Sequence, residues 1–133
     1  MTTSKRYKTY GIGAALVDTE IKVLDSDLTN MSVEKGLMTL VDESRQSELL
    51  GHLDGHLVKA THASGGSAGN SMIAAAHFGA PTFMSCKVAN DADGDIYLAD
   101  LEAAGVGHNL KGKRDDGTTG KCLVLITPDA ERS

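Results

Sequence analysis

The order of helix and strand patterns between residues 42 and 106 is the feature that most limits how this chain can fold. A helix is predicted after Asp42, a good N-cap residue, because Leu49, Leu50 and Leu53 fall on one face of the segment that follows. The remaining patterns are strands at 56–63 and 80–89 and helices at 67–78 and 92–106. Such alternation is typical of a parallel sheet with helices packed on it, so we predict an α/β fold.

Short apolar or alternating segments flank this α/β region and are predicted to form a small separate β-sheet. They fall within residues 9–24, 37–41 and 107–127. A chain of 133 residues is long enough for one modest domain with a single core. The chain stops shortly after its last apolar segment, so we expect a sequence that is cut short and leaves a strand edge exposed.

Charge and composition argue against several classes of partner. The formal net charge is -5, and no cluster of basic residues with interleaved aromatics is present, which argues against a nucleic-acid-binding role. No apolar run approaches the roughly 20 residues of a membrane helix, and the N-terminus does not resemble a signal peptide. Cys86 and Cys122 form no CxxC motif. We therefore expect a cytoplasmic protein that binds neither nucleic acid nor membranes.

Three short motifs resemble ligand-binding signatures but fail on spacing. The segment GIGAAL has Leu16 at the third glycine position of a dinucleotide fingerprint. The acidic run DADGD at 91–95 resembles a calcium loop, but Ile96 stands where the turn glycine is required. His52 and His56 lie four residues apart, without a third or fourth ligand at a known spacing. The sequence therefore predicts no metal site and no NAD site.

The segment HASGGSAGNSMIAAAHFGA, from His62 to Ala80, is the strongest candidate for a binding site. Gly65 and Gly66 allow a ligand to approach the backbone, and Asn70 in the helix that follows offers hydrogen-bond donors and an acceptor. No lysine follows the glycines, so the segment is not a P-loop. Spacing alone leaves two interpretations open: a ligand site, or a tight strand-to-helix turn with glycines for close packing.

Several motifs, taken in order, resemble the opening portion of a ribokinase/PfkB-family carbohydrate or nucleoside kinase. They are GIGAALVD, KGLMTLVDE, ASGGSAGNS, CKVANDADGD, LEAAGV and GTTGKCLVLITPDAERS. The segment KGLMTLVDE is most similar to the adenosine-kinase-like branch. The resemblance implies a partial ribokinase-like fold: a parallel sheet with flanking helices over about 42–106, and a β-sheet lid from strands within 9–24, 37–41 and 107–127. It also implies that the C-terminal ATP-binding part is missing.

The resemblance assigns substrate-binding roles to four residues. Asp18 corresponds to the acid that holds sugar hydroxyls, Gly65 and Gly66 to the glycine pair that lines the sugar pocket, and Asn70 to the asparagine that hydrogen-bonds the sugar. The family's catalytic base lies in a G-A-G-D-type motif that this sequence lacks. ATP and Mg²⁺ are therefore cofactors of the parent enzyme, and neither is expected to bind this chain tightly.

The function implied is the substrate-binding portion of an ATP-dependent kinase that phosphorylates a primary hydroxyl of a sugar or nucleoside. The chain alone is expected to be inactive and to self-associate or dimerise through its lid strands. Two alternatives stay open: a non-catalytic carbohydrate- or nucleoside-binding module, and a shortened chain without any activity. The sequence departs from the family at Met72, where a small residue is usual, and at Ala89, where glycine is usual.

Overall fold

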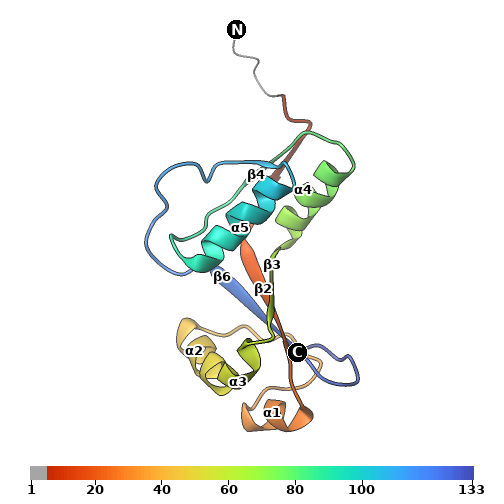
Figure 1. The fold of residues 1–133 in the computed structure, drawn as a ribbon, viewed down its shortest axis with the longest axis vertical. Helices are drawn as coiled ribbons and strands as arrows, with labels where there is room; N and C mark the ends of the chain where they lie inside the picture. The colour runs from red at the N-terminus through yellow and green to blue at the C-terminus, as the bar shows by residue number, and fades with distance from the viewer. Residues whose placement is uncertain (1–5) are drawn as a thin grey trace. The chain divides into compact units, whose positions relative to one another are not determined.

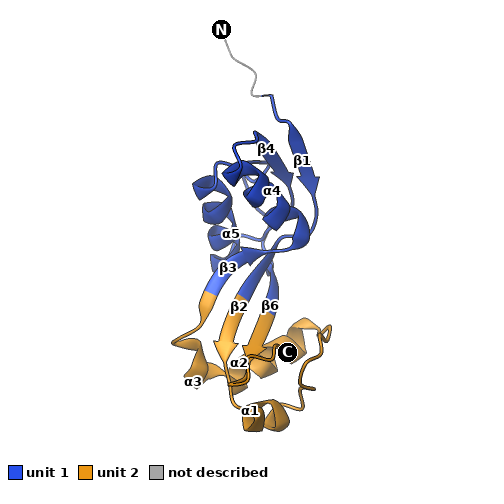
Figure 2. Ribbon diagram, turned by 90° about the vertical axis from the view of Figure 1, so that its right-hand side faces the viewer, with its two compact units in different colours: residues 1–18, 62–122 blue, residues 19–61, 123–133 orange. Residues whose placement is uncertain are grey.

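The computed structural model describes residues 6–133 and divides the chain into two compact units. Unit 1 comprises residues 1–18 and 62–122, and unit 2 comprises residues 19–61 and 123–133 (Figure 2). Figure 1 shows the order of helices and strands along the chain. Each unit has its own cluster of buried apolar residues, so each is described by itself.

Unit 1 contains a parallel sheet of three strands, in the order β1 (Thr9–Ile12), β4 (Thr82–Ser85) and β5 (Gly107–His108). Both pairings in this sheet are parallel. Helix α4 (Ser67–His77) packs on β1 and β4, and helix α5 (Ala92–Ala103) packs on β5. The predicted α/β fold with a parallel sheet and flanking helices is therefore confirmed.

The core of unit 1 lies among these strands and helices. Its largest fully buried side chains are Tyr97 and Leu101 of α5 and Met84 of β4. The N-cap of α5 is Asp91, whose side chain accepts a hydrogen bond from Gly94 N at 2.8 Å. After the helix ends, Gly105 adopts a φ of 74°, a left-handed conformation that glycine adopts without strain. Local sequence therefore sets both ends of this helix.

A second sheet has the strand order β3 (Thr61–Gly65), β2 (Leu16–Lys22) and β6 (Gly120–Ile126). The ends of β2 and β6 that belong to unit 1 carry Asp18 and Cys122. At its other end, β6 forms an antiparallel bridge between Ile126 and Arg132. The last residues of the chain thus turn back on β6, rather than leaving that part of the strand edge open as the sequence predicted.

Unit 2 contains three short helices, α1 (Asp25–Asn30), α2 (Glu43–His52) and α3 (Asp54–Leu57). Asp42 caps α2 by accepting a hydrogen bond from Arg45 N at 2.8 Å, as predicted. The buried apolar residues of this unit come from its strand segments and helices and from positions directly adjoining them: Ile21, Val23, Leu28, Met31, Leu49, Leu53 and Leu125. They form a small core of their own.

The predicted division into lid strands and an α/β part is wrong in two respects. Strands β1 and β5, assigned to the lid segments 9–24 and 107–127, pair with β4 in the parallel sheet. Residues 37–41 form no strand, and Leu40 in this segment is 93% exposed. Strand pairing joins segments that are distant in sequence. The apolar pattern of one segment therefore does not predict which other strand it pairs with.

Candidate functional site

The site predicted from the sequence is built around the turn between β3 and α4, within unit 1. Gly65 is the last residue of β3, and Gly66 is the N-cap of α4. Gly66 has a φ of 88°, a conformation that side chains rarely adopt, and a Cβ there would lie 2.6 Å from the Ala14 carbonyl oxygen. The glycine at this position is thus required both by the backbone angle and by the neighbouring loop.

Asp18 and Gly65 are brought into direct contact by the pairing of β2 with β3. A Cβ on Gly65 would lie 2.6 Å from Cγ and Oδ1 of Asp18 and closer still to Oδ2. The carboxylate therefore occupies the space that any side chain at position 65 would need. Asp18 is partly buried, and Gly65 is buried. Asp18 and Gly65, two of the four predicted site residues, are far apart in sequence and lie side by side in the structure.

Asn70 lies one helical turn after Gly66. Its N–H donates to the Gly66 carbonyl oxygen at 3.0 Å, the first hydrogen bond of α4, and its side chain is exposed. The N–H groups of residues 67–69 come before this hydrogen bond, so they have no acceptor within the helix. A hydroxyl or carboxylate oxygen near the turn would meet these donors, as well as the partial positive charge of the helix N-terminus.

Cys122 is a neighbour of Asp18 that sequence reasoning did not place near the site. Burial raises the pKa of the Cys122 thiol, and the nearby Asp18 carboxylate raises it further. The thiol therefore stays protonated at neutral pH, so it adds no negative charge beside the carboxylate. No motif links Cys122 to Asp18, because the pairing of β6 with β2 alone brings them together.

The first turns of α4 pack closely against their neighbours at positions where a glycine or alanine leaves room. A Cβ on Gly69 would collide with the Tyr97 hydroxyl, and a Cβ on Gly13 would lie 2.6 Å from that of Ala68. Strand β3 is held as well, because Ser64 N donates to Asp100 Oδ2 at 2.8 Å. These contacts position the glycine pair and Asn70, and they could not be predicted from local spacing.

Tyr97 is fully buried, and its hydroxyl finds no hydrogen-bond partner within residues 6–133. Burial raises the pKa of this phenol to about 12, with a smaller contribution from Cys86. The hydroxyl therefore remains protonated over the whole physiological range. Its position against Gly69 makes it a packing contact of the site.

The departures from the family pattern at Met72 and Ala89 are both accommodated by the packing. Met72 is buried, and its Cγ would lie 2.7 Å from a Cβ on Gly11, so the absent side chain of Gly11 makes room for it. Ala89 is also buried, and its N–H donates to Thr119 Oγ1 at 3.0 Å. Neither residue disturbs the turn between β3 and α4.

Thr119 is in turn held by Asp91, which joins the start of α5 to the segment before β6. Its N–H and hydroxyl donate to Asp91 at 2.8 Å and 2.6 Å. Burial raises the pKa of the Asp91 carboxyl, but the hydrogen bonds from Thr119 and Gly94 and the charge of Lys121 together hold it below its usual value. This carboxylate therefore stays ionised and anchors the segment that leads into β6.

Across residues 6–133, the structure contains no group of three or more histidine, cysteine, aspartate or glutamate side chains arranged to hold a metal ion. Likewise, none of the helices in this range is long and apolar enough to cross a membrane. The described site thus consists of one carboxylate, one carboxamide, a glycine pair and the N-terminus of α4.

Comparison with known proteins gave matches to kinases. The family model described as pfkB family carbohydrate kinase matches residues 30–133. A probable sugar kinase from Rhizobium etli CFN 42 is 32% identical, with a TM-score of 0.80, over 98% of this chain and 38% of that chain. Adenosine kinase from Sinorhizobium meliloti is 35% identical, with a TM-score of 0.74, over 98% of this chain and 38% of that chain.

A more distant structural match, adenosine kinase from Anopheles gambiae, shares the fold at 23% identity, with a TM-score of 0.78. It is matched over 94% of this chain and 39% of that chain. The comparison with curated proteins gave no match. The chain thus spans less than two-fifths of the length of these solved kinases.

Proposed function

The chain belongs to the pfkB family of carbohydrate kinases, and from this premise we propose that it forms the acceptor-binding part of an ATP-dependent sugar or nucleoside kinase. The acceptor is a molecule with vicinal hydroxyls and a primary hydroxyl that receives the phosphoryl group. The observation that carries the proposal is the contact of the Asp18 carboxylate with Gly65, beside the N-terminus of α4.

Each proposed residue has a role that follows from its chemistry. An ionised carboxylate accepts strong hydrogen bonds, so Asp18 accepts from one or two neighbouring hydroxyls of the acceptor. The Asn70 carboxamide donates and accepts, which suits a hydroxyl that needs both. Gly65 and Gly66 carry no side chain, so the Asp18 carboxylate and the Ala14 carbonyl group pack directly against the turn, and the glycine pair shapes the wall of the proposed pocket. Together these groups fix the orientation of the acceptor, and phosphoryl transfer depends mainly on such positioning.

Mg-ATP supplies the transferred phosphoryl group and the metal charge that stabilises it. We assign no residue of this chain to ATP, Mg²⁺ or the catalytic base. We infer that the 133-residue chain binds the acceptor without phosphorylating it. A nucleoside is our first candidate, since the 35% identical relative is described as an adenosine kinase; a simple sugar is the second, since the 32% identical relative is described as a probable sugar kinase.

The test is a calorimetric titration of the chain with adenosine and with ribose, followed by the same titration of variants. Loss of a charge-assisted or buried hydrogen bond typically costs about 1–3 kcal/mol, so Asp18→Asn and Asn70→Ala should each weaken binding roughly 5- to 150-fold. The matched controls are Asp116→Asn and Asn30→Ala, which change exposed residues outside the site. These controls should bind with unchanged affinity.

The outcomes separate the possible acceptors. Saturable binding of adenosine that is lost in both site variants supports a nucleoside site, and the same pattern for ribose supports a sugar site. Equal affinity in the wild type and both site variants would place the pocket elsewhere and overturn the proposal. Turnover of the acceptor with Mg-ATP by this chain would contradict the inference that it only binds.

A further inference from the structure

A cavity of about 550 Å³ lies at the amino ends of the strands of the parallel sheet in unit 1. Tyr7 precedes β1, Thr82 begins β4 and Gly107 begins β5, and all three residues line the cavity. The site described above instead adjoins the loop that follows the carboxyl end of β1, where the Ala14 carbonyl oxygen meets Gly66. The cavity is therefore a different site, and its volume suits a small molecule.

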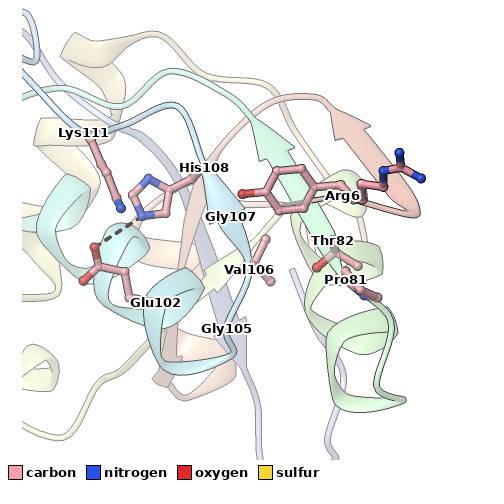
Figure 3. Close-up of a pocket in the computed structure, with 10 residues that line it drawn as sticks. Arg6, Pro81, Thr82, Glu102, Gly105, Val106, Gly107, His108 and Lys111 are labelled. Carbon is pink, nitrogen blue, oxygen red and sulfur yellow. Dashed lines mark hydrogen bonds and ion pairs between the residues drawn. The ribbon is translucent and has the colours of Figure 1, made fainter. Parts of the chain in front are cut away.

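Thr82 gives this cavity an unused hydrogen-bonding group. The residue is 1% exposed, and its Oγ1 has no hydrogen-bond partner in the described part of the chain. A buried hydroxyl without a partner is unfavourable, and water or a bound group can supply the missing hydrogen bond. Figure 3 shows Thr82 beside Pro81, across Val106 and Gly107 from His108 and Glu102.

The opposite wall of the cavity holds a fixed polar pair. His108 Nδ1 accepts a hydrogen bond from Leu110 N at 3.2 Å, so its proton is on Nε2, which donates to Glu102 Oε1 at 3.3 Å. The His108 side chain is 2% exposed. Glu102 Oε1 therefore faces the His108 ring, and the Glu102 side chain as a whole is 57% exposed.

The residues that line the cavity include more basic than acidic side chains. Arg6 and Lys111 both line it, whereas Glu102 is its one lining carboxylate. Figure 3 shows the Lys111 side chain directed toward the pair formed by His108 and Glu102. Lys111 forms no ion pair within the described residues. Since the whole chain has a net charge of -5, this local excess of positive charge stands out.

We propose that this cavity is a second binding site, which takes a small organic anion: a phosphate or carboxylate group on an apolar body. Lys111 holds the acidic group, the Thr82 hydroxyl donates to the ligand, and Tyr7, Pro81 and Val106 contact the apolar body. The proposal is independent of the acceptor site, because it uses none of the residues assigned there.

The experiment follows backbone amide resonances of the ¹⁵N-labelled chain by NMR during titration with phenyl phosphate, benzoate, inorganic phosphate and benzyl alcohol. Phenyl phosphate or benzoate should cause saturable shifts at Thr82, His108 and Lys111. Inorganic phosphate should bind more weakly, because it lacks the apolar body, and benzyl alcohol should cause no such shifts. The tighter of the two aromatic anions identifies the acidic group that the site prefers.

Variants separate the proposed contacts from general effects of charge and folding. Lys111→Gln and Thr82→Val should each weaken binding by at least about fivefold, the usual consequence of losing a charge-assisted or buried hydrogen bond. Lys113→Gln is the matched control, since Lys113 is exposed in the same loop but does not line the cavity. Thr82→Val should fold at least as stably as the wild type, because it replaces an unpartnered hydroxyl with an apolar group of similar shape.

The proposal is overturned if neither aromatic anion causes saturable shifts in these residues, or if benzyl alcohol binds as tightly as they do. It is also overturned if Lys111→Gln binds no more weakly than Lys113→Gln, or if Thr82→Val keeps wild-type affinity. An Asp18→Asn variant should bind the anion with unchanged affinity, and a loss in that variant would show that the ligand occupies the acceptor site instead.

Discussion

Replacement of Gly65 by alanine should disrupt the contact between β3 and the Asp18 carboxylate. An alanine Cβ at this position would lie 2.6 Å from Cγ and Oδ1 of Asp18, whereas unbonded carbon atoms normally approach to about 3.5 Å. Either the carboxylate or β3 must therefore move by roughly 1 Å. Gly65 does not have a positive φ, so the substitution adds no backbone strain of its own. Overpacking of this kind typically costs about 1–3 kcal/mol of unfolding free energy.

Urea denaturation of a double-mutant cycle isolates this contact. In an Asp18→Ala background the clashing atoms are gone, so Gly65→Ala should cost less there, by about 1 kcal/mol or more. The matched control is Gly51→Ala in α2, where a Cβ would meet nothing within 4 Å. Replacing a helical glycine with alanine should raise stability by about 0.5–1 kcal/mol. The reasoning fails if Gly65→Ala costs the same in both backgrounds, or if it stabilises the chain as Gly51→Ala does.

Two further predictions concern the packing around α5. Asp91→Asn should lower the unfolding free energy. The difference in unfolding free energy between this variant and the wild type should be fully present above the ordinary aspartate pKa of about 3.9. It should shrink as the pH falls through the lower pKa that Asp91 has in the folded state. Urea denaturation of both proteins between pH 6 and pH 2 measures this difference in unfolding free energy. A difference that grows on acidification contradicts the prediction. Tyr97→Phe should leave thermal stability unchanged or raise it, because the hydroxyl it removes is buried without a partner. A clear drop in melting temperature would show that this hydroxyl contributes a favourable interaction.

The helices of this chain could be predicted from local sequence more reliably than its strands. Asp42 and the leucines after it define α2, and Gly105 marks the end of α5, because capping and termination depend on residues close together in the chain. The strand predicted at 37–41 is wrong because its apolar residues are exposed and find no neighbouring strand within the described residues. Strand pairing depends on distant segments, which periodicity does not identify.

In the candidate site, too, the features set by local sequence could be predicted, whereas those set by tertiary packing could not. The glycine pair and Asn70 were predicted from a single contiguous segment, and that segment does form a strand, a turn and a helix. The contact between Asp18 and Gly65 and the collision of a Gly69 Cβ with Tyr97 depend on tertiary packing. Only the family resemblance connected Asp18 to the glycines, since no spacing rule relates residues on separate strands.

The packing of Met72 against Gly11 has a consequence for how this sequence evolved. The two residues share one volume, so the effect of a substitution at either position depends on what the other position holds. A lineage that gains the methionine while position 11 still carries a side chain passes through an overcrowded intermediate, whereas the reverse order passes through a small cavity. We therefore expect the two positions to covary among family members, with a larger residue at position 11 wherever position 72 is small.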